Sequence, residues 1–319
     1  MRARAGLLAA LLAACGGSAE QPSPPSPSAE GALGPGPSAQ SPSAEGALGP
    51  GPSAQSSVGE GAPPARDPDA PAACPPREEW PEGMACVLGG TFTLGDASGR
   101  PDEREAGEVY VDTFYMDLYE VTNAQFERCI EAGECDRPMP FRGFMGPNLP
   151  MVAVSWYDAG DHCRMLGKRL PTEAEWERAA SGPDDTRYPW GDEPLGCERA
   201  VVKDERGEGC GRERTYPVGS MEPGHFGLYD MAGNVHEWVH DWYSPCLRGC
   251  ENECGDACFG RNPRGPCDGE SPCPGYRLRS VRGGSWYWPL ERARASARRG
   301  SGAPNRGPHR FGFRCARDP

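Results

Sequence analysis

The distribution of glycine, proline and cysteine constrains this chain more than any other feature. Gly (44) and Pro (36) together make up about a quarter of the 319 residues, which is roughly twice their ordinary usage. Both residues interrupt regular helices, so a helical bundle or a coiled coil is excluded. The fifteen Cys fit an oxidising compartment better than the cytosol. We therefore expect a loop-rich fold with disulfides.

The first fifteen residues have the pattern of an export signal. Arg2 and Arg4 precede a short apolar run that ends before Cys15, and this run is too short to span a membrane. The segment Leu12 to Cys15 looks like a bacterial lipobox, in which the Cys is acylated. We predict that residues 1–15 are a lipoprotein signal peptide with a lipidated Cys15. The alternative is a plain signal peptide with an incidental Cys.

Residues 16–73 are predicted to be a disordered linker. They consist mostly of Pro, Gly, Ser and Ala, and Ser26–Gln40 repeats without change at Ser41–Gln55. Large apolar residues are too few to offset the entropy lost on ordering. We expect a tether that holds a domain away from a membrane, on the periplasmic or surface side of the cell envelope.

Residues 74–319 contain all eight Trp and are long enough for one sizeable core. The segment 109–121 is rich in β-branched and aromatic residues and predicts strand structure. Three helix starts have side chains that can cap the first turn. They are Thr122-x-x-Gln125, Ser155-x-x-Asp158 and Thr172-x-x-Glu175.

Eight collinear motifs in this domain resemble the formylglycine-generating enzyme, or sulfatase-modifying factor, family. They include EVTN at 120–123, GKRLPTEAEWE at 167–177, GLYDMAGNVHEW at 227–238, RGGSW at 282–286 and GFRC at 312–315. The resemblance implies a single α/β domain with a C-type-lectin-like core, little regular secondary structure and a surface groove. Cysteine-rich residues 244–274 are expected to be a disulfide-rich insertion.

The family's catalytic cysteines are missing from the expected place. The resemblance implies two copper-binding thiolates shortly after Gly-Gly-Ser, but no Cys occurs between Cys273 and Cys315. Trp288 stands at the first position, and Glu291 or Ala293 at the second. Copper(I) needs such soft ligands, so copper and formylglycine production are not expected. Five His and no added helical domain also argue against an iron-dependent branch of the family.

The family pocket would instead be lined by aromatic and basic residues, and no catalytic residue is assigned. Residues 275–319 hold eleven Arg and two acids, inside a protein of net charge −13. One interpretation is an Arg-lined groove for an acidic peptide, carboxylate or sulfate; the other is that these Arg pair with Asp and Glu across the domain. The net charge argues against nucleic acid. The pocket candidates are Ser285, Trp286, Trp288, Arg292, Arg294 and Arg298.

One stretch of the chain, residues 230–240, matches two kinds of metal site. The resemblance implies a structural calcium site, with oxygen ligands that map onto Asp230, Gly233, Val235 and Glu237. The overlapping HEWVH, residues 236–240, also matches the H-E-x-x-H zinc-protease motif. That motif requires a helix, and Gly233-Asn234 just before it argues against one. We therefore expect calcium and not zinc.

The cysteines that follow Cys15 are even in number. The resemblance implies a Cys163–Cys315 disulfide, and close spacing favours Cys74–Cys86, Cys129–Cys135 and Cys197–Cys210. Pairing of the other six cannot be deduced from sequence. Four of these six could alternatively form a Cys₄ zinc site. The six are Cys246, Cys250, Cys254, Cys258, Cys267 and Cys273.

These features predict an exported lipoprotein whose family chemistry has been lost. Its domain would bind a peptide, protein or glycan ligand in the groove, and its lipid would hold it to the membrane. The alternatives are a family oxidase with a non-standard site, which would convert a protein Cys or Ser to formylglycine, and a zinc peptidase.

Overall fold

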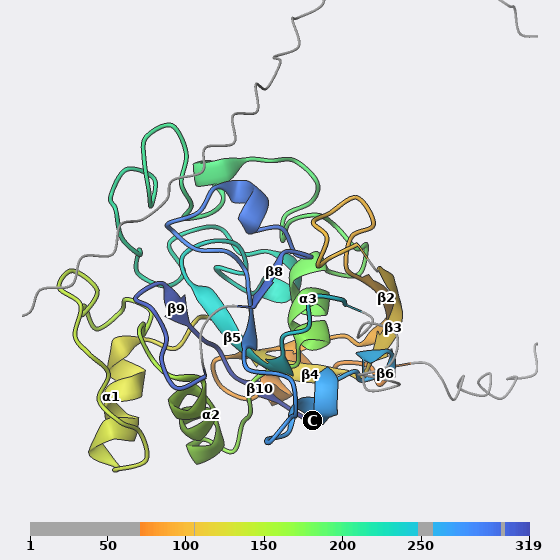
Figure 1. Ribbon diagram of the computed structural model, residues 1–319, viewed down its shortest axis with the longest axis horizontal. Coiled ribbons are helices and arrows are strands. Elements are labelled where there is room, and N and C mark those ends of the chain that lie inside the picture. Colours follow the sequence, from red (N-terminus) through yellow and green to blue (C-terminus); the bar gives the residue numbers. More distant parts are fainter. Residues whose placement is uncertain (1–70, 105, 248–257, 301–303) are drawn as a thin grey trace, which may run out of the picture. The chain divides into compact units, whose positions relative to one another are not determined.

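The computed structural model describes residues 71–104, 106–247, 258–300 and 304–319. Cys15 and residues 16–70 of the expected linker lie outside the described residues. Short strands and long loops dominate the domain (Figure 1). The described helices include none long and apolar enough to cross a membrane.

The described residues form ten short strands in three small sheets. One has the order β1-β4-β10, the second β2-β3-β6 and the third β8-β7-β5-β9. Within the third sheet β5 pairs antiparallel with β7 and parallel with β9. The strands are β1 (Met84–Val87), β2 (Gly90–Leu94), β3 (Gly107–Val111), β4 (Phe114–Asp117), β5 (His236–Trp242), β6 (Gly260–Arg261), β7 (Arg279–Arg282), β8 (Arg298–Gly300), β9 (Phe311–Gly312) and β10 (Ala316–Arg317).

The predicted strand material at 109–121 is two strands, β3 and β4, which belong to different sheets. Asp112 and Thr113 separate the two strands. The Thr113 hydroxyl accepts a hydrogen bond from the Gly89 N–H. A Cβ on Gly89 would lie 2.3 Å from the Val111 carbonyl oxygen. This close approach of two backbones, which composition does not reveal, ends the first strand.

The three predicted helix starts are confirmed. Helix α1 (Asn123–Glu131) and helix α3 (Glu173–Ser181) each begin with a complete capping box, from Thr122 and Thr172. Ser155 caps helix α2 (Trp156–Met165) by accepting a hydrogen bond from the Asp158 N–H. A side-chain cap satisfies an N–H that the helix leaves unpaired.

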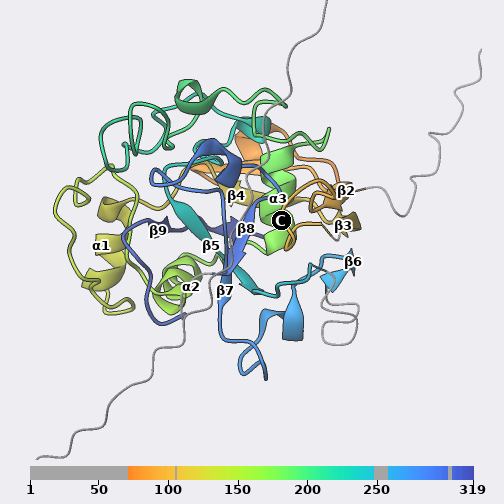
Figure 2. The same ribbon diagram turned by 45° about the horizontal axis from the view of Figure 1, so that its top comes forward.

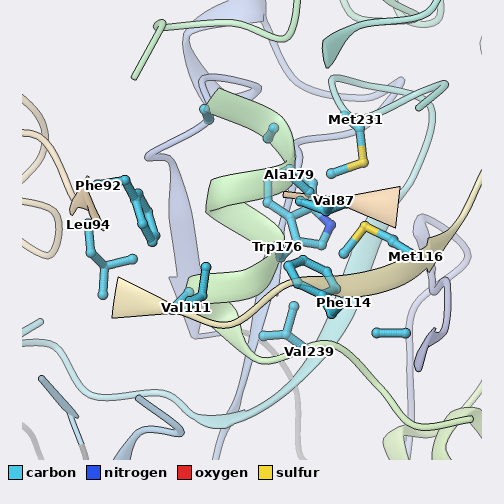
Figure 3. Close-up of a cluster of buried hydrophobic side chains, with 14 of the residues drawn as sticks. Val87, Phe92, Leu94, Val111, Phe114, Met116, Trp176, Ala179, Met231 and Val239 are labelled. Atoms are coloured by element: carbon cyan, nitrogen blue, oxygen red, sulfur yellow. The ribbon is translucent and has the colours of Figure 1, made fainter. Parts of the chain in front are cut away.

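Helix α3 lies at the centre of the domain, between the sheet of β2 and β3 and the sheet of β5 and β8 (Figures 1 and 2). All nine of its residues are buried. Trp176 packs in the middle of the largest apolar cluster, beside Val87, Phe114 and Val239 (Figure 3). The acidic residues of α3 are therefore buried as well, and they need basic partners.

The four expected disulfides are present, including the 152-residue link from Cys163 to Cys315. In the insertion Cys267 pairs with Cys273, and Cys246 and Cys258 are also disulfide-bonded. Cys250 and Cys254 lie outside the described residues. Because Cys246 and Cys258 are oxidised, the alternative of a Cys₄ zinc site is wrong.

Candidate functional site

The chain enters the candidate site from strand β7 through a tight glycine turn. Gly284 has φ +71°, and a Cβ there would lie 2.8 Å from the Arg292 carbonyl oxygen. The turn brings the backbone close to Arg292 and Ala293, at the end of the short 3-10 helix Leu290–Arg292. The Ser285 hydroxyl is buried and has no hydrogen-bond partner. Ser285 therefore lies below the surface of the site.

Aromatic rings continue outward from this turn. Trp286 is buried and packs against Phe144 at 5.5 Å and against His309 at 5.7 Å between ring centroids. Tyr287 is exposed, and its ring lies 5.2 Å from that of Trp288. Of these rings, Tyr287 and the half-buried Trp288 present flat apolar surfaces beside the site, whereas Trp286 is part of the packing beneath it.

Trp288 occupies the surface of the site. Its ring lies beneath two guanidinium groups, with Arg299 at 5.2 Å and Arg292 at 5.9 Å from the ring centroid. The next cysteine along the chain, Cys315, is bonded to Cys163. No thiol of segment 274–314 can act here, because that segment contains no Cys.

Two of the predicted pocket arginines have carboxylate partners. Arg294 binds Glu103 at 2.7 Å and Asp96 at 3.1 Å. Arg298 makes two hydrogen bonds to Glu173 of helix α3, at 2.9 and 2.6 Å. Arg294 is not among the residues that line the pocket described below, and its charge is paired inside the domain. For these two residues the pairing interpretation holds.

Other basic residues complete a small pocket around Trp288, which we call the cationic pocket. Its wall includes His236 at the start of β5 and Arg299 on β8, and the Arg310 guanidinium lies over the neighbouring Tyr287 ring at 5.5 Å. Among the described residues, no Asp or Glu belongs to the wall. The lining residues are Arg100, His236, Val281, Trp288, Arg292, Ala297, Arg298 and Arg299.

The sequence pattern indicated only part of this pocket. Arg292, Arg298 and Trp288 were expected, whereas Arg100, His236 and Arg299 were missed. Arg298 and Arg299 both line the pocket, but among the described residues only Arg298 has a carboxylate partner. The run of arginines at 292–299 was the available signal.

The electrostatics of the pocket reflect crowded positive charge. Burial lowers the pKa of His236 to about 3, and Arg299 and Arg310 lower it as well. The pKa of the Arg299 guanidinium is also lowered, first by burial and then by Arg310 and Arg100. His236 is therefore neutral at physiological pH, while the arginines remain charged.

The residues of the expected calcium site lie in the adjoining turn and in β5. Both oxygens of Glu237 contact Arg314, and one also accepts a hydrogen bond from the Trp176 indole. Asp230 accepts a hydrogen bond from the Gly219 N–H, and burial raises the pKa of its carboxyl to about 6. Gly233 and Val235 are buried in the same turn. Calcium binding remains a prediction. An ion bound here would share the Glu237 carboxylate with Arg314.

The HEWVH motif lies on strand β5 and not on a helix. Four residues along a strand span about 13 Å, so His236 and His240 are too far apart to share one zinc ion. His240 contacts the Asp268 carbonyl and Arg264 instead. This geometry removes the reason for proposing a zinc peptidase.

Residues 71–319 match the family described as "Sulfatase-modifying factor enzyme 1-like domain". The chain belongs to this family. It is 32% identical to the formylglycine-generating enzyme of Thermomonospora curvata, over 80% of this chain and 99% of that protein. The resemblance expected from the motifs is thereby confirmed, together with the mixed α/β fold.

Two other relatives have names that do not describe an active formylglycine-generating enzyme. The chain is 30% identical to mouse "Inactive C-alpha-formylglycine-generating enzyme 2", over 73% of this chain and 85% of that protein. It is 34% identical to "Serine/threonine-protein kinase pkn1" of Chlamydia pneumoniae over 74% of this chain, but spans only 38% of that protein.

A solved structure with the same fold is PvdO from Pseudomonas aeruginosa. It aligns with a TM-score of 0.59 and 27% identity, over 74% of this chain and 94% of that chain. A variable protein of Treponema denticola, at 20% identity and a TM-score of 0.58, has the same fold.

Proposed function

We propose that this chain is an exported lipoprotein whose sulfatase-modifying-factor domain binds a ligand and does not make formylglycine. The observation that carries the proposal is Trp288, which stands at the expected thiolate position under two arginines. An indole can neither bind copper(I) nor exchange with a substrate thiol. The remaining side chains form a binding surface.

The rest of the molecule is consistent with a binding role outside the cytosol. Oxidised cysteines are typical of exported proteins, and acylation of Cys15 would hold this one at a bacterial membrane. Aromatic rings beside the pocket suit an extended peptide, a protein segment or a glycan. An inactive relative shows that family membership does not require the family's oxidase activity.

An assay of the purified full-length protein tests the loss of chemistry. The protein is given copper, oxygen and a sulfatase-type Cys peptide, and the peptide mass is followed. We expect no aldehyde, whereas the enzyme of Thermomonospora curvata, assayed in parallel, should convert the peptide. Aldehyde formation would instead support the non-standard oxidase. Losing that turnover on mutation of Cys267 or Cys273 would then identify the insertion as its site.

A further inference from the structure

Three guanidinium groups beside Trp288 lack a counter-charge. Across the parts of the chain that the structure describes, Arg292, Arg299 and Arg310 form no ion pair, although Arg282, Arg294, Arg298 and Arg314 all do. Their neighbours are aromatic rings, at 5.2 to 5.9 Å. Like charges gathered without a partner are unfavourable, and an anion would relieve the repulsion.

Unused hydrogen-bonding atoms are found at the same place. Among the described residues, the Trp288 indole N–H, the Arg310 Nε and both ring nitrogens of His236 are buried and have no hydrogen-bond partner. A buried polar group without a partner destabilises the fold, because its hydration is lost and not replaced. His236 is 4% exposed and lines the pocket wall. All of these atoms except one His236 nitrogen are donors, so the missing partner is rich in acceptors.

The size of the pocket limits what can enter it. Its enclosed volume is about 10 Å³, which is close to the volume that one water-sized atom needs. A single ligand oxygen therefore fits inside, and the rest of the group must lie at the rim, near Arg292 and Arg299.

We propose that the cationic pocket binds the phosphoryl group of a phosphomonoester. One oxygen would enter toward His236 and the Trp288 indole N–H, and the others would contact Arg292, Arg299 and Arg310. A phosphomonoester carries nearly two negative charges at pH 7, which suits three unpaired arginines better than a monoanionic sulfate ester. The inference rests on the proposed binding function and gives its ligand a chemical class.

Calorimetry with phenyl phosphate and the full-length protein at pH 7.5 tests the proposal. We expect binding that weakens at least tenfold in Arg299→Gln and in Arg292→Gln. The matched control is Arg77→Gln, because Arg77 also lies over an indole, at 5.8 Å from the Trp80 ring, but outside the pocket. Equal affinity in the wild type and both pocket variants would overturn the proposal.

Two comparisons distinguish a pocket that prefers a dianion from one that binds any anion. They are the affinity for phenyl sulfate and the pH dependence of phenyl phosphate binding. Phosphate affinity should fall below pH 6, where the dianion of the ester takes up a proton and becomes a monoanion, and sulfate affinity should not. The groups facing the ligand are His236 and the arginines at 100, 292, 298 and 299, with Arg310 over the adjoining Tyr287 ring and Glu173 behind Arg298. Guanidinium groups do not titrate between pH 5 and 8. His236, with a pKa of about 3, stays neutral in this range, and Glu173, whose pKa is lowered by its arginine partners, stays ionised. Sulfate binding as tight as phosphate binding would contradict the assignment.

A second pair of experiments shows whether the phosphoryl group belongs to a lipid headgroup or to a soluble ester. Vesicles with phosphatidic acid are compared with vesicles of phosphatidylcholine, using the same variants. Binding of phosphatidic acid alone identifies a lipid headgroup, and binding of phenyl phosphate identifies a soluble ester; binding of neither overturns the proposal. The aldehyde assay is independent, so a failure here leaves the loss of oxidase activity separately testable.

Discussion

Arg314 and Glu237 form a fully buried ion pair with two hydrogen bonds. The Nε–Oε2 distance is 2.8 Å and the Nη2–Oε1 distance is 2.7 Å, and both side chains are essentially inaccessible to solvent. Arg314 belongs to the C-terminal GFRC motif, whereas Glu237 belongs to the GLYDMAGNVHEW motif. The pair therefore links two family motifs through the core.

Removing the charge of Glu237 should destabilise the fold. Glu237→Gln leaves the Arg314 cation buried without a counter-charge, which typically lowers the free energy of unfolding by about 3–5 kcal/mol. Urea unfolding followed by fluorescence measures this. In the control Glu127→Gln, which breaks an exposed pair with Arg137, we expect no measurable change. A loss no larger than that of the control would contradict the prediction.

Calcium should stabilise the protein through Asp230. A cation bound to the native state raises the melting temperature, so a chelator should lower the melting temperature of the wild type. Asp230→Ala should remove this dependence, while Glu193→Ala, at an exposed carboxylate, should retain it. Thermal unfolding with calcium and with chelator measures both. If the chelator acts equally on wild type and Asp230→Ala, the ion lies elsewhere.

Asp241 should weaken the fold as pH rises. Burial, followed by the nearby Glu173 carboxylate, raises the pKa of its carboxyl to about 8. Because the native-state pKa exceeds the unfolded value, stability is full at low pH and declines toward pH 8, by up to about 1.4 kcal/mol per unit. Asp241→Asn can still accept the hydrogen bond from the Glu173 N–H.

Unfolding of wild type and Asp241→Asn is therefore compared at pH 5 and pH 8. We expect the variant to gain stability relative to wild type as pH rises. A constant difference between the two proteins would mean that Asp241 is ionised throughout this range.

The disulfides should contribute according to the loops they close. Cys163–Cys315 spans 152 residues and Cys129–Cys135 spans 6. In the chain-entropy model these correspond to about 5 and about 2 kcal/mol. Replacing each pair by Ala and measuring unfolding in urea compares them. A larger loss from the short loop would show that native packing outweighs loop entropy here.

Acylation of Cys15 predicts membrane attachment. Cys15→Ala should move the protein from the membrane fraction to the soluble fraction, because the mature chain would lose its lipid. Fractionation and immunoblotting of the expressing bacterium measures this, with Ser18→Ala as the control. Retention of Cys15→Ala in the membrane would contradict lipidation at this residue.

The sequence alone determined the family, the starts of three helices and four disulfides. Family motifs are read directly, and Thr122 and Thr172 cap their helices through residues only three positions away. Such short-range relations survive in a linear pattern. The sequence also shows directly that no Cys occurs between Cys273 and Cys315, where the family's copper ligands are expected.

Only the tertiary structure decided which arginines remain available for a ligand. Arg294 is neutralised by Glu103, 191 residues away, and Arg298 by Glu173, 125 residues away. Arg299, one residue further along β8, has no such partner among the described residues. Charge pairing depends on distance in space, and composition alone could not separate adjacent arginines that point into different surroundings.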